Sequence, residues 1–256
     1  MYDKKFVFVC GLHRSGTSIL FQSLKDHPEI SGFADTGTVE DEGQHLQSAM
    51  PSDNAYLGTG RFAFCKDFNW TEDSPLVSMR VREKLLTEWG VFWDLNKNVL
   101  LEKSPPNIIH TRFLQALFPN SYFITIKRDP IATTLATRSF INKKRLRYNM
   151  YHMVKHWCVA HDIYDKDKKS LKNIYELQYE DFVQEPDRYF KEICNFIGVK
   201  PSPISASIRQ GTNDKYFTQW ENYKKGWFSK YIAKFIEHCF ESETNKHGYS
   251  LLSHRR

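Results

Sequence analysis

A group of hydroxyl and basic side chains follows the first apolar run of the chain. The run 6–10 leads into the glycine loop 11–16, GLHRSG, and a helix is predicted to begin at Thr17 and Ser18. Unpaired backbone N–H groups and the positive end of the helix dipole meet at such a helix N-terminus, so an anion can bind there. Arg14 is the only cation in the loop. The stretch therefore predicts a site for a phosphate-like group.

The loop has the spacing of a P-loop but lacks the P-loop lysine. Gly11 and Gly16 enclose four residues, and Thr17 stands where a Walker A loop has its lysine. A kinase or ATPase uses that lysine on the phosphates, and usually holds Mg²⁺ with the next hydroxyl. Here hydroxyls, N–H groups and the Arg14 guanidinium are offered instead. The alternative interpretation is a glycine turn that only joins a strand to a helix.

Basic residues also stand at the ends of two further predicted strands. The apolar run 99–102 ends at Lys103, and the β-branched and aromatic run 121–127 ends at Arg128. Strands that alternate with helices form parallel sheets, which bind ligands beyond the carboxyl ends of their strands. We therefore predict an α/β fold, a central parallel β-sheet flanked by helices, in which the loop 11–16, Lys103 and Arg128 meet.

Apolar periodicity predicts the other elements. A fourth strand is expected at 174–178, and helices are expected at 18–27, 80–93, 107–117, from 131 onward, around 153–164, at 187–197 and at 228–240. The segment 29–62 has no sustained period, so we predict a long irregular loop with one short helix near 44–50. A Pro/Ser-rich link precedes a basic glycine turn at 223–227.

Composition and length favour one large domain over residues 1–256. With 256 residues, 41% of them hydrophobic, the chain can bury a full core, and no internal repeat is visible. The net charge of +6 suggests attraction to an anionic ligand, while nucleic acid is an improbable partner. The oligomeric state stays open.

The cysteines and the apolar runs indicate the cellular compartment of the protein. Five scattered cysteines, without a C-x-x-C pair, are expected to be reduced thiols. No signal peptide and no run approaching ~18 apolar residues is present, so we expect a cytoplasmic protein without a membrane partner.

Two patterns have a functional and a structural interpretation. His152 and His156 are four apart on a predicted helix, but no Glu lies between them in the H-E-x-x-H sense and no third ligand is evident. We therefore predict no metal site. The basic run of Lys143, Lys144, Arg145 and Arg147 is either a solvated helix end or a patch for an anionic substrate.

Five stretches, taken in order, resemble the sulfotransferases that use 3′-phosphoadenosine 5′-phosphosulfate (PAPS), in particular the glycan and tyrosylprotein branch. The resemblance runs from Gly11 to Trp227. The stretches are the loop 14–18, similar to the family's 5′-phosphosulfate loop; Glu102-Lys103-Ser104-Pro105, whose lysine faces the sulfuryl group in glycan sulfotransferases; Arg128, similar to the 3′-phosphate arginine; Tyr179-Glu180-Asp181; and Lys224-Lys225-Gly226, similar to a late loop over the 3′-phosphate.

The resemblance implies a P-loop-NTPase-like fold, PAPS as co-substrate, and transfer of a sulfuryl group to the hydroxyl of a small-molecule or glycan acceptor. The nucleotide-binding residues that it implies are His13, Arg14, Ser15, Gly16, Thr17, Ser18, Arg128, Tyr179, Lys224, Lys225 and Gly226. One position departs from the family, because Ala136 replaces a serine commonly found eight residues after the arginine. Thr133, Thr137, Ser139 or the lysines near 225 are left to compensate.

The predicted catalytic residues are two cations and an acid. Arg14 and Lys103 can meet the negative charge that develops during transfer. A base must take the proton of the acceptor, and we favour Glu42, because Gly43 leaves room beside it, with Glu40 next. Further candidates for the base are Asp41, Asp35 and His45. The alternative interpretation of this acidic cluster is a solvated turn.

Two other functions compete with sulfuryl transfer. One is a P-loop kinase or nucleotidyltransferase, which the missing lysine disfavours. The other is a non-catalytic module that binds a nucleotide or a polyanion through its basic segments.

Overall fold

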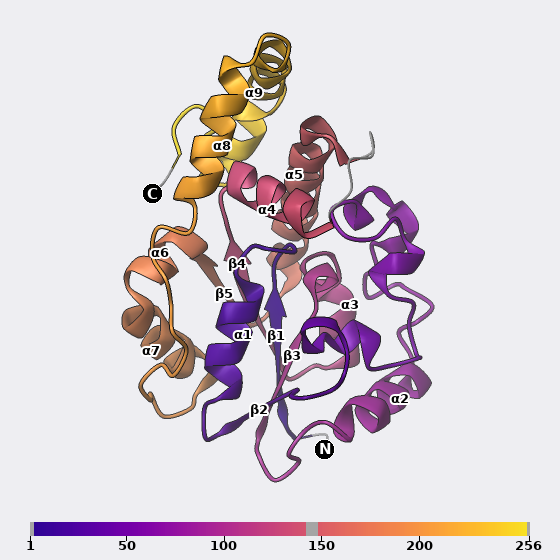
Figure 1. The fold of residues 1–256 in the computed structure, drawn as a ribbon. Helices are drawn as coiled ribbons and strands as arrows, with labels where there is room; N and C mark the ends of the chain where they lie inside the picture. The colour runs from indigo at the N-terminus through magenta and orange to yellow at the C-terminus, as the bar shows by residue number, and fades with distance from the viewer. Residues whose placement is uncertain (1–2, 142–147, 255–256) are drawn as a thin grey trace.

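Five parallel strands form the centre of the protein in the computed structural model (Figure 1). The structure describes residues 3–141 and 148–254. The strands are β1 Lys5–Cys10, β2 Ile30–Gly32, β3 Val99–Lys103, β4 Ser121–Lys127 and β5 Ile174–Gln178, in the order β2-β3-β1-β4-β5. The predicted α/β fold with a central parallel sheet is confirmed.

Helices cover both faces of this sheet. They are α1 Thr17–Lys25, α2 Met79–Gly90, α3 Thr111–Leu117, α4 Pro130–Ile141, α5 Met150–Asp167, α6 Tyr179–Gln184, α7 Pro186–Ile197, α8 Asp214–Lys225 and α9 Ser229–Lys246. Figure 1 shows α1 on one face and α3 and α5 on the other, with α8 and α9 above the carboxyl ends of the strands. The covered faces explain why the strands are continuous apolar runs rather than alternating ones.

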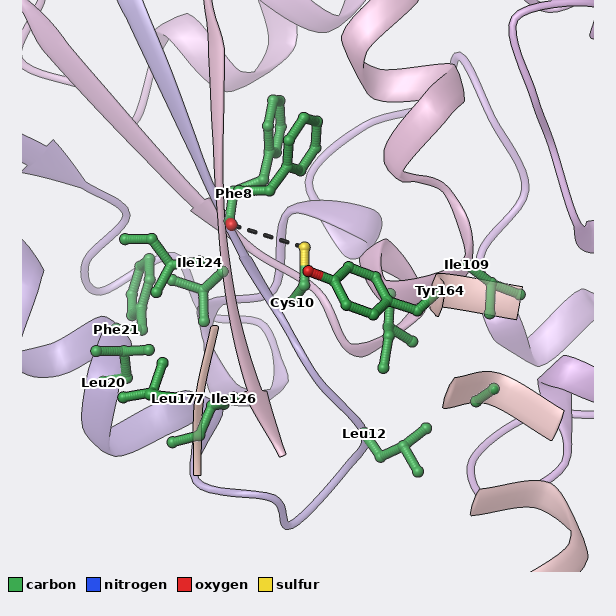
Figure 2. Close-up of a cluster of buried hydrophobic side chains, with 14 of the residues drawn as sticks. Phe8, Cys10, Leu12, Leu20, Phe21, Ile109, Ile124, Ile126, Tyr164 and Leu177 are labelled. Atoms are coloured by element: carbon green, nitrogen blue, oxygen red, sulfur yellow. Dashed lines mark hydrogen bonds between the residues drawn. The ribbon is translucent and has the colours of Figure 1, made fainter. Parts of the chain in front are cut away.

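The core consists of two layers of side chains, one on each face of the sheet. Successive residues of a strand point to opposite faces. Figure 2 shows Cys10 with Ile109 and Tyr164 on one side, and Leu20 and Phe21 of α1 with Ile124, Ile126 and Leu177 on the other. The carboxyl ends of β1 and β4 are thus held from both sides.

The order of the strands places a crevice between β1 and β4. After β1 the chain moves to β2 at one edge of the sheet, and after β4 it moves to β5 at the other edge. Adjacent strands whose connections leave in opposite directions open a crevice at their carboxyl ends, where ligands bind in such sheets. The loop 11–16 and Arg128 follow these two strands directly.

The predicted helix near 44–50 is wrong. The backbone forms only a short 3-10 turn, Gly43–His45, and then continues irregularly. The reason is local competition, because the Gln47 side chain accepts a hydrogen bond from the Met50 N–H (2.7 Å) and donates one to the Met50 carbonyl (2.8 Å). Such side-chain bonds offer the backbone an alternative to helical ones.

Other boundaries also differ from the predictions. The helix expected at 107–117 is divided at His110 into a 3-10 turn, Pro105–Ile109, and α3. The prediction missed β2, α6 and α8, and α9 extends to Lys246. The basic run Lys143, Lys144, Arg145 and Arg147 lies outside the described residues. Within the described ranges, no helix combines the length and the apolar character needed to cross a bilayer.

Candidate active site

The glycine loop forms an anion cradle in front of α1. Arg14 has φ 66° and Gly16 has φ 103°, so two left-handed residues turn the loop back onto the helix N-terminus. A Cβ on Gly16 would lie 2.5 Å from Cδ2 of Tyr179, which explains why only glycine fits there. The buried Oγ of Ser15 has no hydrogen-bond partner among the described residues. The cradle therefore offers backbone N–H groups to a ligand.

Arg128 provides a second anion-binding point at the end of β4. Its Nε donates to Oδ1 of Asn213 (2.8 Å), and Nη1 donates to the Arg14 carbonyl (2.7 Å). The guanidinium carbon lies 4.4 Å from the ring centre of Tyr179 and 5.5 Å from that of Tyr216. Nη2 is buried without a partner among the described residues. A planar cation with one unused donor is thereby fixed at the cavity, as a phosphate site requires.

A buried acid holds the arginine in place. Glu180 Oε1 accepts hydrogen bonds from Asn213 Nδ2 (2.7 Å) and from the Asp129 N–H (3.1 Å), and Oε2 accepts one from the Tyr249 hydroxyl (2.8 Å). Burial raises the pKa of the Glu180 carboxyl. Glu180 thus acts through Asn213 on Arg128 and does not line the cavity itself.

Lys103 lies at the end of β3 with its side chain 1% exposed. Its ammonium donates to the Glu40 carbonyl (2.9 Å) and lies 3.3 Å from Oε1 of Glu42. A buried ammonium is stable only with such partners. The lysine is therefore held beneath the segment that carries the predicted base.

The two predicted acids have different environments. The half-exposed Glu40 accepts a hydrogen bond from the Ser18 hydroxyl through Oε2, and its Oε1 lies 3.8 Å from Nη1 of Arg14. Glu42 is 5% exposed and accepts a hydrogen bond from Gln44 Nε2 at 2.7 Å. The cluster is thus a bonded part of the site, and the alternative of a solvated turn is wrong for Glu42. Of the further candidates, Asp41 binds the Thr36 hydroxyl instead.

A cavity of about 370 Å³ lies beside these groups, although the buried Ser15 and Lys103, which the sequence predicted, are not among its lining residues. Its lining includes His13, Arg14, Gly16, Thr17, Ser18, Glu40, Glu42, His45, Arg128 and Tyr179, which the sequence predicted, together with Asp53, Asn54, Thr59, Phe140, Thr212, Lys215 and Tyr216. The Arg14 guanidinium carbon lies 5.6 Å from the ring centre of Phe140, so the aromatic ring covers one face of this cation.

Lys224, Lys225 and Gly226 do not line the cavity, contrary to the prediction. They lie at the end of α8, and the Lys224 ammonium pairs with Glu221 (2.8 Å) and Glu237 (3.4 Å). The first turn of α8 faces the cavity instead, and about ten residues at 1.5 Å each place the lysines roughly 15 Å farther on. Lys215 is the α8 lysine that lines the cavity.

Ala136, which stands where the family commonly has a serine, has apolar neighbours. Ala136 is buried in an apolar cluster with Tyr216 and Phe217 of α8. The Thr137 hydroxyl donates to the His13 carbonyl (3.2 Å) and the Thr133 hydroxyl to the Arg128 carbonyl (3.4 Å). Both threonines thus hold the backbone of the site, whereas Ser139 is exposed.

Sequence reasoning missed Asp53, Lys215 and Tyr216. Lys215 and Tyr216 follow the link before α8. The available signal for this helix is the apolar residues 216, 217 and 220, which are spaced as on one face of a helix. Asp53 stands alone in the irregular segment, where no pattern marks a buried acid.

The histidines of α5 have other partners. His156 packs edge-on against Phe62, with ring centres 4.7 Å apart, and Nδ1 of His161 lies 2.7 Å from the Trp157 carbonyl. Across residues 3–141 and 148–254, no three His, Cys, Asp or Glu side chains are grouped so that they could hold a metal ion.

Comparison with known proteins gives a family match and several fold matches. The sequence model described as the sulfotransferase family matches residues 7–203. An uncharacterised protein of Aquifex aeolicus (strain VF5) is 21% identical over 269 residues, an alignment that covers 92% of this chain and 32% of that protein. The chain thus spans about a third of the length of this curated relative.

Three solved structures share the fold. The sulfotransferase domain from the curacin biosynthetic pathway is 14% identical, with a TM-score of 0.54 and coverage of 91% of this chain and 97% of that domain. The sulfotransferase domain of the Synechococcus PCC 7002 olefin synthase is 15% identical, with a TM-score of 0.54 and coverage of 84% and 88%. A Mycobacterium tuberculosis H37Rv sulfotransferase is 13% identical, with a TM-score of 0.51 and coverage of 84% and 71%.

Proposed function

Because this chain belongs to the sulfotransferase family, whose sequence model matches residues 7–203, we propose that it transfers a sulfuryl group from PAPS to a hydroxyl of a small-molecule or glycan acceptor. The observation that carries the proposal is the pair of anion-binding points in one cavity. Gly16, Thr17 and Ser18 of the cradle and Arg128 line this cavity, and Nη2 of Arg128 is a buried donor without a partner among the described residues. A nucleotide with phosphate groups at both its 5′ and 3′ positions fits such a pair.

The residues around the cavity suit this donor. The loop 13–18 would hold the 5′-phosphosulfate, with Lys103 behind Glu42, while Arg128, Tyr179 and Lys215 would surround the 3′-phosphate and its nucleoside. No metal ion is needed for this arrangement, because the cations of the chain itself face the charge.

Arg14 and Lys103 would stabilise the transition state. The acceptor oxygen forms a new bond to sulfur while the bond from sulfur to the 5′-phosphate oxygen breaks, and negative charge builds on that leaving oxygen. A fixed cation or N–H donor in a dry site contributes about 3 kcal/mol to such a step. Glu42 faces the same space, and the structure adds a second buried carboxylate, Asp53, to the same wall.

The acceptor would enter beside these acids. That side of the cavity is lined by His45, Asn54 and Thr59, which offer hydrogen bonds to a polar molecule. We therefore retain a hydroxyl-bearing small molecule or a glycan as the acceptor class.

The first test compares nucleotides. We expect adenosine 3′,5′-bisphosphate (PAP) without Mg²⁺ to raise the melting temperature more than ATP with Mg²⁺, because the loop has no Walker lysine. A larger shift with ATP and Mg²⁺ would instead favour the kinase or nucleotidyltransferase.

The second part of the test measures transfer. Radiolabelled PAPS and a panel of hydroxyl acceptors should give a labelled product, and Lys103→Met should lower its rate ~100-fold or more. Lys224→Met is the matched control, because the ammonium of this lysine pairs with Glu221 and Glu237 at the far end of α8. Binding of PAP without any turnover would favour the non-catalytic module, and equal rates for the two variants would refute the role of Lys103.

A further inference from the structure

Three carboxylates line the cavity, and they differ in what already binds them. Both oxygens of Glu40 have partners, Ser18 and Arg14, and both oxygens of Glu42 have partners, Lys103 and Gln44. Asp53 is 2% exposed, and its Oδ2 has no hydrogen-bond partner among the described residues. A buried carboxylate oxygen without a hydrogen-bond donor is energetically costly. Its position beside the cavity therefore suggests that a group of the ligand supplies the donor.

The backbone around Asp53 is firmly positioned. Its N–H donates to Oε1 of Gln44 (3.0 Å), and its carbonyl accepts from the N–H groups of Tyr56 (2.8 Å) and Gly58 (2.9 Å). The same Gln44 side chain donates to Glu42, so one amide fixes the two acids relative to each other. Asp53 is thus preorganised next to the residues that hold Lys103.

The titratable groups around Asp53 come from the glycine loop and from the turn 42–45. Nε2 of His13 lies 3.7 Å from Asp53 Oδ2, and Glu42 lies on the neighbouring turn with His45 beside it. Burial, and then the nearby His156, lower the pKa of His13 to about 3, so His13 is neutral near pH 7. Burial and then the charge of Glu42 raise the pKa of Asp53 to about 7.

We propose that Asp53 is the catalytic base, which takes the proton from the acceptor hydroxyl, and that Glu42 is a positioning residue for Lys103. The proposal rests on the sulfuryl transfer proposed above. Protonation of Glu42 would remove the charge opposite the buried Lys103 ammonium, whereas Asp53 has an unused oxygen. A base is most effective when its pKa lies near the working pH, which Asp53 meets and the neutral His13 does not.

The step balances without a further reactant. The acceptor oxygen bonds to sulfur as its O–H bond breaks, and the proton moves to Oδ2 of Asp53. The electron pair of the cleaved sulfur–oxygen bond stays on the 5′-phosphate of PAP. The products are a sulfate ester, PAP and a neutral Asp53 carboxyl, which returns its proton to solvent when the products leave.

The test compares Asp53→Asn with Glu42→Gln in the full chain, using radiolabelled PAPS and the best acceptor of the panel. The wild-type rate should rise with pH and level off above about 7, the pKa of Asp53. We expect Asp53→Asn to lose ~100-fold or more of the rate and to lose this inflection. Glu42→Gln should lower the rate and retain an inflection, moved to lower pH because the charge of Glu42 no longer raises the pKa of Asp53.

Two readouts separate catalysis from structure. The PAP-induced rise in melting temperature should be nearly the same for Asp53→Asn and wild type, because the substitution changes only the group opposite the neutral His13 side chain (3.7 Å) and leaves Arg128 and the loop backbone in place. Formate should restore part of the rate of Asp53→Ala, since a small carboxylate can occupy the space left, whereas it should not restore Glu42→Ala.

The outcomes distinguish this inference from the proposed function. If wild type binds PAP and transfers label but Asp53→Asn keeps the wild-type rate and pH profile, the role of Asp53 is refuted and sulfuryl transfer stands. The same holds if the inflection disappears in Glu42→Gln instead. If PAP fails to bind wild type, the sulfotransferase function itself fails.

Discussion

Arg128 shows what a single side chain contributes when the fold fixes it from all sides. Its guanidinium lies over the rings of Tyr179 and Tyr216, and two of its nitrogens bond to Asn213 and to the Arg14 carbonyl. A lysine would keep the charge but would lose the planar contacts and the fixed direction of the remaining donor. The sequence therefore predicted the residue, but the aromatic pair and Asn213 become visible only in the structure.

Asp53 should lower the stability of the protein at neutral and alkaline pH. Its pKa is about 7 in the fold and 3.8 as the ordinary value, so the folded state binds the extra proton. The resulting stabilisation is present below pH ~4 and is lost as the pH rises through 7. Asp53→Asn, which mimics the protonated acid, should therefore raise the melting temperature at pH 8 and change it little at pH 4.

The measurement is the difference in melting temperature between variant and wild type across this pH range. A stabilisation of 1 kcal/mol corresponds to about 2–4 °C for a chain of this size. His13 titrates in the opposite sense but is present in both proteins, so the difference removes its contribution. The exposed Asp67→Asn is the control and should show no such dependence. A melting temperature lowered at pH 8 would show that the Asp53 charge stabilises the fold.

At the scale of elements, the sequence predicted the strands better than the connections. The runs in β1, β3 and β4 are recognisable because both faces of the sheet are buried, and each strand is apolar along its length. The three-residue β2 and the turns between 33 and 68 have no period, since tertiary contacts and side-chain bonds such as those of Gln47 hold them. The acids of the site lie in that segment, so the choice among them is the part of the site that the sequence predicts least.

The turn before α1 depends on Gly16 for two reasons, its positive φ and the close approach of the Tyr179 ring, and substitution can separate them. Gly16→Ala should weaken PAP binding ~10-fold or more and destabilise the protein, because the new methyl group would push Tyr179 away from Arg128. Gly37→Ala is the matched control, since Gly37 also has a positive φ (75°) but has no atom near its Cβ position.

Calorimetry with and without PAP measures both effects. Gly37→Ala should cost only the ~1 kcal/mol of a left-handed alanine and leave PAP affinity unchanged. Equal losses of PAP affinity in the two variants would mean that backbone strain alone, and not the contact with Tyr179, sets the requirement at Gly16.

At the scale of the whole molecule, the part of the chain beyond the family match completes the nucleotide side of the cavity. The match ends at residue 203, whereas Asn213, Lys215 and Tyr216 follow it and line or support the cavity. The segment after α9 packs against the residues behind Arg128, where Nδ1 of His254 lies 3.2 Å from Oδ2 of Asp129. These contacts support the prediction that residues 1–256 act as one domain, in which the last helices stabilise the site.

Tyr249 provides the test of this support, because it touches Glu180 and is absent from the cavity lining. Tyr249→Phe removes one of the donors to a buried carboxylate, which should lower the free energy of unfolding by ~1–3 kcal/mol. Glu180 then holds Asn213 less firmly, and Asn213 in turn positions the Arg128 guanidinium through a charge-assisted hydrogen bond. PAP affinity should therefore fall roughly 2–10-fold.

Tyr231→Phe, at a residue 61% exposed, is the control for loss of a hydroxyl. Denaturant unfolding and PAP titration of both variants measure the two effects separately. A loss of stability with unchanged PAP affinity would show that the last segment holds the fold together without controlling the arginine.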